Sequence, residues 1–457
     1  MQFTECGLEM QLKSRVIFEV VNEENGEIIT REEIINVPVE RPKTIDQIGL
    51  DITLQQQLIQ STADMIISLQ GPLINTHKNC PKCQRKVIKK GHTSCEVHAL
   101  NTDHVIKIQK YRCPDCDWTS SDSIRTMYGT DVHTALTKAQ AELGASYSYR
   151  KVVSVLKMFS FDKERPVNNK ERIKRVLTEV GQYIAEYNTM EVSEVDAKNK
   201  ASELIVHVDG AHVPSKENGK RSFEVMTGTI YRPEDVKVIN ENENIIENKV
   251  CIASANEDEQ ASMKVMLINA AKRSGMTATT KVTAFSDGAA NCKSVINALA
   301  PHCSNLEVIL DWFHISMKFQ NIIPSLSADL QAIMKSAKWK LWHGLQDDCY
   351  EKLEDAAKKI EDEKFKERTK KLIQYLKNNK DILTNYEEKK LTNKPFTSQV
   401  AESTVENLVN SRCRQTGKMQ WLRKGAHALL QVRCTHYCKS FNKVWDYVAP
   451  KLLQKAA

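Results

Sequence analysis

The sequence predicts an α/β protein built on a mixed β-sheet, with an all-helical insertion and two smaller modules before the sheet. Three observations predict this class. Apolar segments rich in β-branched residues end in aspartate at 204–209, 281–287 and 306–311. Helical patterns separate the later two segments, and a long stretch without strand patterns follows them. Two Cys-x-x-Cys motifs lie upstream, within a basic part of the chain.

Composition limits the classes of function. With 457 residues, 41% of them hydrophobic and 27% charged, the chain has room for two to four domains of a soluble protein. It contains no apolar run of about 18 residues and no signal-peptide pattern at its start. We therefore expect no membrane-spanning segment, no membrane partner and a cytoplasmic location. Thirteen unevenly spaced cysteines favour metal-bound and free thiols over a disulfide framework.

The positive charge is concentrated in one region. Residues 75–180 contain 20 Lys and Arg against 11 Asp and Glu, whereas the rest of the chain is nearly balanced at 45 against 47. A local basic excess is expected of a surface that contacts phosphates, although a basic solvent-exposed face is the alternative interpretation.

The first module that can be assigned is a zinc ribbon over 75–128, after an N-terminal hairpin and helix over 1–74 whose role the sequence does not reveal. Cys80, Cys83, Cys113 and Cys116 form two Cys-Pro-x-Cys motifs separated by a strand-rich spacer of 29 residues. Four thiolates suit tetrahedral Zn²⁺, and a closed set of four leaves no place for a reactive water, so this zinc is structural. Cys95 and two nearby histidines are weaker candidate ligands.

Residues 129–190 predict a helix-turn-helix module. Its third helix begins after Asn168 or Asn169, either of which can cap it, and carries Ile173, Val176, Leu177 and Val180 on one face. We expect this helix to enter a DNA groove through a polar and basic set of residues. That set is Asn168, Lys170, Arg172, Lys174 and Arg175.

The order of elements after residue 190 predicts a ribonuclease H-like fold. Three strands in series are followed by alternating helices and strands over 191–315, which is the order of that mixed sheet. The helical stretch 316–396 interrupts it as an insertion, and residues 397–457 complete it with C-terminal helices. Asp209 on the first strand and Asp287 on the fourth would then be neighbours.

Converging carboxylates suit cleavage of phosphodiesters by two divalent cations, and Mg²⁺ prefers oxygen ligands. A further acid must come from a later helix. Glu402 and Glu406 lie four residues apart on one predicted face of the final long helix, 399–415. Their spacing does not distinguish them.

These motifs together resemble the bacterial insertion-sequence DDE transposases, relatives of the Mutator-like elements, over residues 75–450. The resemblance rests on five short motifs in order along the chain. They are Asp209-Gly210, Asp287-Gly288, Asp311-Trp312-Phe313-His314, Val405-Glu406-Asn407 and the tail from Thr416 to Trp421 that leads to Val444-Trp445.

The resemblance implies a catalytic triad of Asp209, Asp287 and Glu406 that binds Mg²⁺ or Mn²⁺, with Asp311 and His314 as an accompanying motif. It also implies a DNA transposase that binds double-stranded DNA at terminal inverted repeats, cleaves strands and transfers them to target DNA. Such enzymes act as homo-oligomers, at least dimers on DNA, and a bacterial, nucleoid-associated location is expected.

Two other classes of function stay open at this point. A ribonuclease H-like nuclease would use similar carboxylates, and a DNA-binding regulator derived from a transposase would keep the N-terminal modules without the chemistry. Near the C-terminus, Cys434, His436 and Cys438 suggest a second zinc site, but the apolar residues around them favour a packing role.

Overall fold

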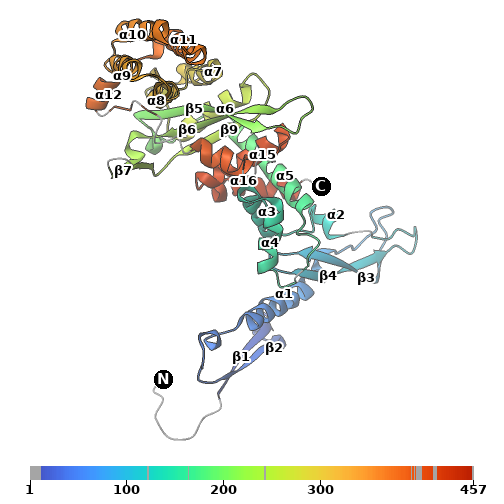
Figure 1. Cartoon of the computed structure of the whole chain (residues 1–457). Coiled ribbons are helices and arrows are strands. Elements are labelled where there is room, and N and C mark those ends of the chain that lie inside the picture. Colours follow the sequence, from blue (N-terminus) through green and yellow to red (C-terminus); the bar gives the residue numbers. More distant parts are fainter. Residues whose placement is uncertain are drawn as a thin grey trace. The chain divides into compact units, whose positions relative to one another are not determined.

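The computed structural model describes residues 12–120, 123–162, 164–240, 243–392, 394–395, 397, 404–414 and 419–454. It divides into two units (Figure 1). The first comprises Met1–Ala139, Arg150–Arg172 and Ala449–Ala457, and the second comprises Gln140–Tyr149 and Ile173–Val448. No helix in the described residues has the length and apolar character needed to span a membrane.

The first unit begins with a β-hairpin and a long helix. Strands β1 (Leu12–Val21) and β2 (Ile28–Val39) pair antiparallel, and a short helix η1 (Ile45–Gln47) leads to helix α1 (Ile52–Ile74). The hairpin turn closes through a hydrogen bond from the Asn22 N–H to the Glu27 carbonyl, and Gly26 supplies the positive φ of 73°. The predicted hairpin and helix are therefore both present.

A second hairpin carries the two Cys-x-x-Cys motifs at its base. Strands β3 (Ile88–His98) and β4 (Asp103–Arg112) pair antiparallel, and helix α2 (Ile124–Tyr128) follows. Helix α1 packs against β4 so closely that a Cβ on Gly71 would lie 2.5 Å from the Lys107 carbonyl oxygen. Glycine is thus required at that contact.

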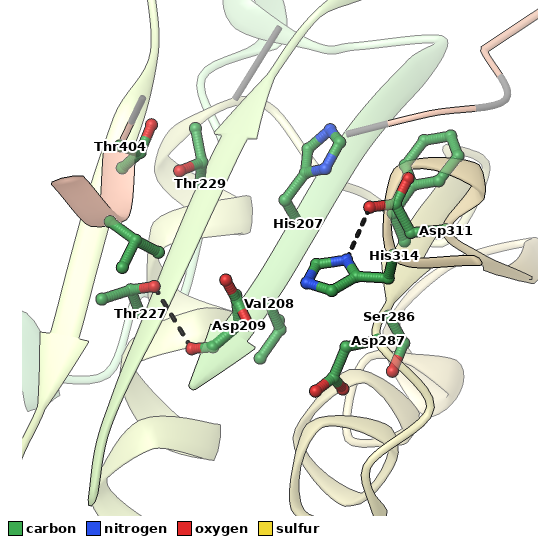
Figure 2. A pocket seen from close by; sticks show the side chains of 12 residues that line it. His207, Val208, Asp209, Thr227, Thr229, Ser286, Asp287, Asp311, His314 and Thr404 are labelled. Carbon is green, nitrogen blue, oxygen red and sulfur yellow. Dashed lines mark hydrogen bonds and ion pairs between the residues drawn. The ribbon is translucent and has the colours of Figure 1, made fainter. Parts of the chain in front are cut away.

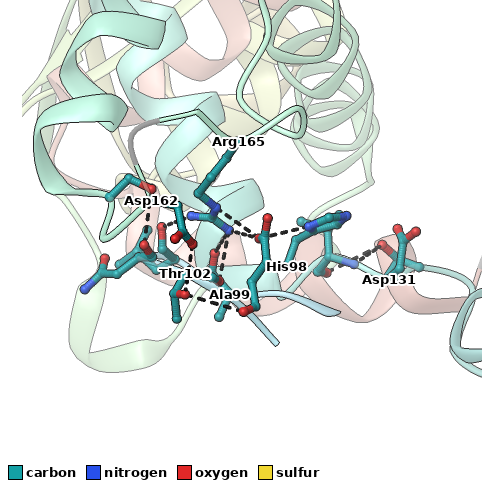
Figure 3. A network of polar contacts seen from close by, with 12 residues as sticks. His98, Ala99, Thr102, Asp131, Asp162 and Arg165 are labelled. Atoms are coloured by element: carbon teal, nitrogen blue, oxygen red, sulfur yellow. Dashed lines mark hydrogen bonds and ion pairs between the residues drawn. The ribbon is translucent and has the colours of Figure 1, made fainter. Parts of the chain in front are cut away.

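A buried arginine joins the turn of this hairpin to the segment after helix α4 (Tyr149–Phe159). The Arg165 guanidinium is almost fully buried and donates to the carbonyls of Ala99, Leu100 and Thr102 (Figure 3). Its Nε donates to Asp103 Oδ1 at 3.0 Å. Burial opposes ionisation of Asp103, but Arg165 and His98 together hold the pKa of this carboxyl below its usual range.

Three helices cover the part of the chain that predicts a helix-turn-helix. They are α3 (Thr134–Ser146), α4 (Tyr149–Phe159) and α5 (Lys170–Thr189). Helix α5 buries the face that the sequence predicts, and a Cβ on its Gly181 would lie 2.2 Å from the Ala428 carbonyl oxygen. Most of α5 is therefore an integral part of the second unit.

The second unit contains a five-stranded mixed sheet, as the sequence predicts. Its order is β11-β10-β5-β6-β9. Strand β10 is parallel to both β5 and β11, whereas β6 is antiparallel to β5 and β9. The strands are β5 (Glu203–Pro214), β6 (Ser222–Tyr231), β9 (Val250–Ser254), β10 (Lys281–Ser286) and β11 (Asn305–Leu310).

A small hairpin that was not predicted from the sequence lies between β6 and β9. Strands β7 (Val236–Asn240) and β8 (Glu243–Ile246) pair antiparallel after the short helix η3 (Pro233–Asp235).

Helices cover both faces of the sheet. Helices α6 (Ala261–Arg273) and α7 (Ala290–Asn297) pack on the face that bears Leu204 and Val206. Residues Ile205 and Phe285 point to the other face, where they join the core of the helical insertion. Parallel strands covered on both faces explain why β5 and β10 read as continuous apolar runs.

The predicted insertion is all-helical in its described residues. It follows α8 (Trp312–Gln320) and contains α9 (Ala328–Trp342), α10 (Gln346–Lys359), α11 (Glu363–Asn378), α12 (Tyr386–Leu391) and the short helices η5 (Ile323–Ser325) and η6 (Lys380–Ile382). Its core is continuous with the sheet.

The C-terminal segment returns to the sheet. A π-helical turn (Glu406–Asn410) and α14 (Ser411–Cys413) precede α15 (Arg423–Tyr437) and α16 (Phe441–Gln454). Helix α15 packs on β9, where Gln431 donates to the Ala253 carbonyl. In the segment between α14 and α15, the backbone N–H of Trp421 donates to the Pro214 carbonyl at 2.9 Å, which fixes this segment to the end of β5.

Candidate functional site

Asp209 lies inside strand β5, and the expectation that the strand ends there is wrong. Strand β5 continues to Pro214 because β6 pairs with it over its whole length, with Asp209 opposite Thr227. Parallel pairing with β10 stops one residue earlier, where Ser286 lies opposite Val208. Asp209 is therefore the first residue of β5 without a partner on β10, and its carboxylate lies at that free edge.

Asp287 follows directly after β10, the neighbouring strand, as the sequence predicts. Its Oδ1 accepts a hydrogen bond from the Ala289 N–H at 2.8 Å, and Gly288 turns the chain with a φ of 88°. The glycine of the first Asp-Gly pair has a different role, because Gly210 is in extended backbone opposite Met226.

Asp311 follows β11 and caps helix α8. One carboxylate oxygen accepts from the Phe313 N–H at 3.2 Å, and the other lies 2.8 Å from Nδ1 of His314. Since an ionised carboxylate only accepts, Nδ1 carries the proton of this bond. Burial opposes protonation of His314, but the bond to Asp311 and the charges of Asp209 and Asp287 raise its pKa overall.

The three aspartates and His314 line one cavity of about 30 Å³ in the second unit. Figure 2 shows the His314 ring between Asp311 and the carboxylates of Asp209 and Asp287. Burial raises the pKa of Asp209, and the carboxylates of Asp287 and Asp311 raise it further, while His314 acts against them. The cavity thus gathers negative charge, which a bound cation would stabilise.

His207 also lines this cavity, although it is not among the site residues predicted from the sequence. It precedes Asp209 by two residues on β5, so the two side chains share a face of the sheet. Its Nε2 lies 2.9 Å from the Tyr231 hydroxyl, and its ring stacks on Phe285 at 4.8 Å. Burial lowers the pKa of His207 to about 4, so the ring is neutral. Side chains alternate between the two faces along β5, and this alternation could have placed His207 on the same face as Asp209.

The helical insertion contacts the backbone that bears two of the aspartates. The Tyr375 hydroxyl donates to the Asp287 carbonyl at 2.7 Å, and the Tyr386 hydroxyl donates to the Leu310 carbonyl at 2.8 Å. A Cβ on Gly288 would lie 2.8 Å from the Asn379 side chain. The insertion therefore positions the site. No local sequence pattern points to these tyrosines.

The structure does not bring Glu406 to the cavity. Its side chain is exposed, and its carboxylate accepts a hydrogen bond from the Asn410 amide at 2.8 Å across the π-helical turn. The residues before it, Thr404 and Val405, line the cavity instead. The π-helical geometry and the Asn410 bond hold Glu406 toward solvent. Glu402, the alternative, lies outside the described residues.

The four cysteines of the first unit form a compact cluster. The Sγ atoms of Cys80, Cys83, Cys113 and Cys116 all lie within 4.8 Å of one another, and the Cys80–Cys116 and Cys83–Cys113 pairs are 3.5 and 3.4 Å apart. Thiolates about 2.3 Å from one zinc ion lie about 3.8 Å apart in a tetrahedron. The cluster therefore has the dimensions to bind a metal such as zinc.

The two Cys-x-x-Cys motifs adopt the same turn. The N–H of Cys80 donates to Arg85 O and that of Cys113 donates to Trp118 O, both at 2.7 Å. The fourth residue after each first cysteine, Gln84 and Asp117, has a positive φ. Burial opposes ionisation of Cys80, but the backbone N–H groups of Cys83 and Lys82 and the thiols of Cys116 and Cys83 lower its pKa to about 7, whereas the pKa values of Cys83 and Cys116 are raised.

Among the described residues, no other cluster of His, Cys, Asp or Glu brings three donor atoms this close together. Asp209, Asp287, Asp311 and His314 of the second unit therefore do not form a cluster of this kind. Cys434 is buried, Cys438 Sγ accepts from the Cys251 N–H, and His436 pairs with Glu142 at 3.2 Å. These three residues do not converge on a common point, in agreement with a packing role.

The candidate DNA-binding residues occupy the start of α5. Asn169, the second candidate cap, caps the helix, because its Oδ1 accepts from the Arg172 N–H at 2.8 Å. Lys170, Lys174 and Arg175 are exposed and Arg172 is half-buried. Asn168 is buried, so the expectation that it contacts DNA at the helix entry does not fit its position.

Comparison with known proteins gives a structural similarity and a family. The Drosophila P element transposase strand transfer complex is weakly similar, with a TM-score of 0.24 and 9% identity, covering 71% of this chain and 82% of that chain. No curated protein matches the sequence. The uncharacterised protein family UPF0236 matches residues 130–442, about two thirds of the chain. The chain therefore belongs to the family UPF0236.

Proposed function

We propose that this protein is a DNA transposase that cleaves and transfers DNA strands at a two-metal site in its second unit. One observation carries the proposal. Asp209 and Asp287 come from adjacent parallel strands in the middle of the sheet and line the same polar cavity as Asp311 and His314. Two carboxylates at one edge of a sheet supply part of the ligand set that a pair of hard cations requires.

The topology of the sheet supports a ribonuclease H-like fold. Taken in chain order, the first strand is central, the second is antiparallel to it, and the fourth and fifth add in parallel on its other side. This is the arrangement expected from the sequence, and it makes Asp209 and Asp287 neighbours. The helical insertion interrupts the fold after β11, between the aspartates and the last helices.

In the proposed chemistry, Asp209 and Asp287 bind Mg²⁺ or Mn²⁺ together with a third carboxylate from the segment 397–415. Bound ions would activate the attacking oxygen and stabilise the leaving one. Asp311 fixes the orientation of His314 through their hydrogen bond, and the His314 ring then presents its other nitrogen to the cavity. Protonated His314 would contribute a positive charge near a phosphate.

DNA binding is assigned to the first unit and to helix α5. The cysteine cluster would bind one structural Zn²⁺, and helices α3, α4 and α5 would form the helix-turn-helix. Exposed Lys170, Lys174 and Arg175 would contact phosphates. The expected DNA partners are the element's terminal inverted repeats and the target DNA, and the expected active form is a homo-oligomer, at least a dimer.

The test separates cleavage from binding. Asp209→Asn keeps the shape of the side chain and removes the charge that holds a dication, so in Mg²⁺ it should abolish cleavage of a duplex bearing the inverted repeats that flank the gene, with binding retained. Asp329→Asn, an exposed acid at the start of α9, is the matched control and should cleave normally.

Other outcomes would identify other functions. Cleavage by Asp209→Asn at the parental rate would remove the proposed site. Cutting that follows DNA structure rather than the repeat ends would indicate a ribonuclease H-like nuclease. Binding by the parent protein without cleavage in either metal would indicate a regulator.

A further inference from the structure

Exposed apolar side chains are concentrated near the N-terminus. Among the described residues, 27 large hydrophobic side chains are exposed, and 11 of them lie between Val21 and Leu73. Exposed apolar residues are ordinary when scattered, but a contiguous group indicates a surface that another molecule covers.

Five of these side chains follow one face of helix α1. Ile52, Ile59, Ile66 and Leu73 recur at intervals of seven residues and are 67%, 51%, 42% and 73% exposed; Leu69 beside them is 44% exposed. An interval of seven shifts the position around a helix by only about 20°, so these residues form one stripe. Over 23 residues the helix is about 34 Å long.

The stripe is not the face that α1 uses to pack in its own unit. Ile67 and Ile74 join the core beneath β4, and Gly71 contacts the Lys107 carbonyl. On another side, Gln57 donates to the Ile34 carbonyl of β2. Figure 1 shows α1 between the β1–β2 hairpin and the β3–β4 hairpin. Ile52, Ile59 and Ile66 thus lie away from the packed positions, whereas Leu73, at the end of the helix, lines a cavity of this unit with Ile67 and Ile74. No described residue of this unit buries the stripe.

The helix has almost no charge. Between Ile52 and Ile74, Asp64 is the only ionisable side chain, and its carboxylate accepts from His104 Nδ1 at 2.7 Å, on the side opposite the stripe. The positions that flank the stripe include Gln55, Thr62 and Gln70, which are uncharged. Glutamine both donates and accepts hydrogen bonds, so an identical face placed against this one meets compatible groups and no like charge.

We propose that the α1 stripe pairs with the same stripe of a second copy of this chain, so that α1 is a dimerisation helix. The four apolar positions recur once in each heptad, and the second seam position of each heptad holds Gln55, Thr62 or Leu69, so two copies of this face present an uncharged, partly apolar seam to each other. A nucleic acid would require basic residues along this face, and a charged protein partner would require complementary charges; the helix provides neither. The proposal does not depend on transposase activity.

The experiment is a sedimentation measurement on the full-length, zinc-loaded chain without DNA, at concentrations from about 0.1 to 50 µM. The parent should sediment as a dimer. Ile59→Glu combined with Ile66→Glu should be monomeric across this range, a rise in dissociation constant of about a hundredfold or more, because both copies would place charge in the apolar seam. Ser68→Glu, exposed on the opposite side of the same helix, should remain dimeric.

Circular dichroism and zinc content serve as controls for correct folding. Both should match the parent in all variants. If the glutamate variant loses structure, Ile59→Gln with Ile66→Gln replaces it, since glutamine favours helix and adds no charge. A monomeric parent would overturn the proposal and indicate that another part of the same chain covers the stripe. A dimer that survives both double substitutions would also overturn it.

Discussion

The hydroxyl of Tyr375 donates a hydrogen bond to the backbone carbonyl of Asp287 at 2.7 Å. Tyr375 belongs to helix α11 of the insertion, and Asp287 follows strand β10, so the bond joins segments 88 residues apart. The phenol is largely buried, and burial with the charges of Asp287 and Asp311 raises its pKa, so it remains a hydrogen-bond donor. The insertion thus holds the main chain of Asp287, one aspartate of the proposed metal site.

Tyr375→Phe should lower DNA cleavage about tenfold, with a loss of about 1 kcal/mol in unfolding free energy, because one buried hydrogen bond is removed and Asp287 is held less firmly. Cleavage rates in saturating Mg²⁺ and denaturant titrations measure the two effects. Tyr350→Phe is the control, since the Tyr350 hydroxyl is buried without a hydrogen-bond partner among the described atoms. An equal loss of DNA cleavage in the Tyr375 and Tyr350 variants would contradict a specific role for Tyr375.

The cysteine cluster predicts one zinc ion per chain. Cys113→Ser should lose the metal and unfold the β3–β4 hairpin, because the binding free energy of a structural zinc contributes directly to folding. Metal analysis and hydrogen exchange of residues 78–120 measure this outcome.

Cys95→Ser provides the control for the zinc prediction. Cys95 lies on β3, between the two motifs in sequence but outside the cluster, so this variant should retain zinc. Zinc-free parent protein, purified under reducing conditions, would exclude the ribbon. Loss of zinc from the Cys95 variant, with zinc retained by the Cys113 variant, would assign Cys95 as a ligand in place of Cys113.

The exposed start of α5 predicts a salt-dependent DNA contact. Lys174→Ala with Arg175→Ala should weaken binding to the inverted repeats and lower the slope of log K against log salt by about 2, one unit for each lost phosphate contact. Lys370→Ala with Lys371→Ala, two exposed lysines on α11, removes the same charge from the insertion. An unchanged slope in the α5 variant would place the DNA surface elsewhere.

The sequence predicts best what short-range chemistry determines. Cys80 and Cys83 are confined to one turn by their spacing, and Gly288 allows the turn after Asp287, so both features follow from local residues. The apolar runs of β5 and β10 likewise predict two strands of the sheet. For the same reason, the buried face of α5 is as the sequence predicts.

Features that depend on a distant partner were not predictable. Strand β5 continues beyond Asp209 only because β6 is long enough to pair with residues up to Pro214. Tyr375 reaches Asp287 from the helical insertion, 88 residues further along the chain. Periodicity detects the face on which a residue lies, but it does not reveal which distant segment contacts that face.

The identity of the third carboxylate of the proposed site can be decided with one pair of variants. The Val405-Glu406 motif favours Glu406, whereas its exposure and its bond to Asn410 count against it. Two cations need a ligand beyond Asp209 and Asp287, so among Glu402→Gln and Glu406→Gln we expect one to reduce cleavage at least about a thousandfold, with the other within about tenfold of the parent. DNA binding, measured in parallel, should be retained by both, since neither lies in the proposed binding helix. Loss of cleavage in both variants, or in neither, would contradict a single third ligand from this segment, and loss in the Glu402 variant alone would assign the role one helical turn upstream.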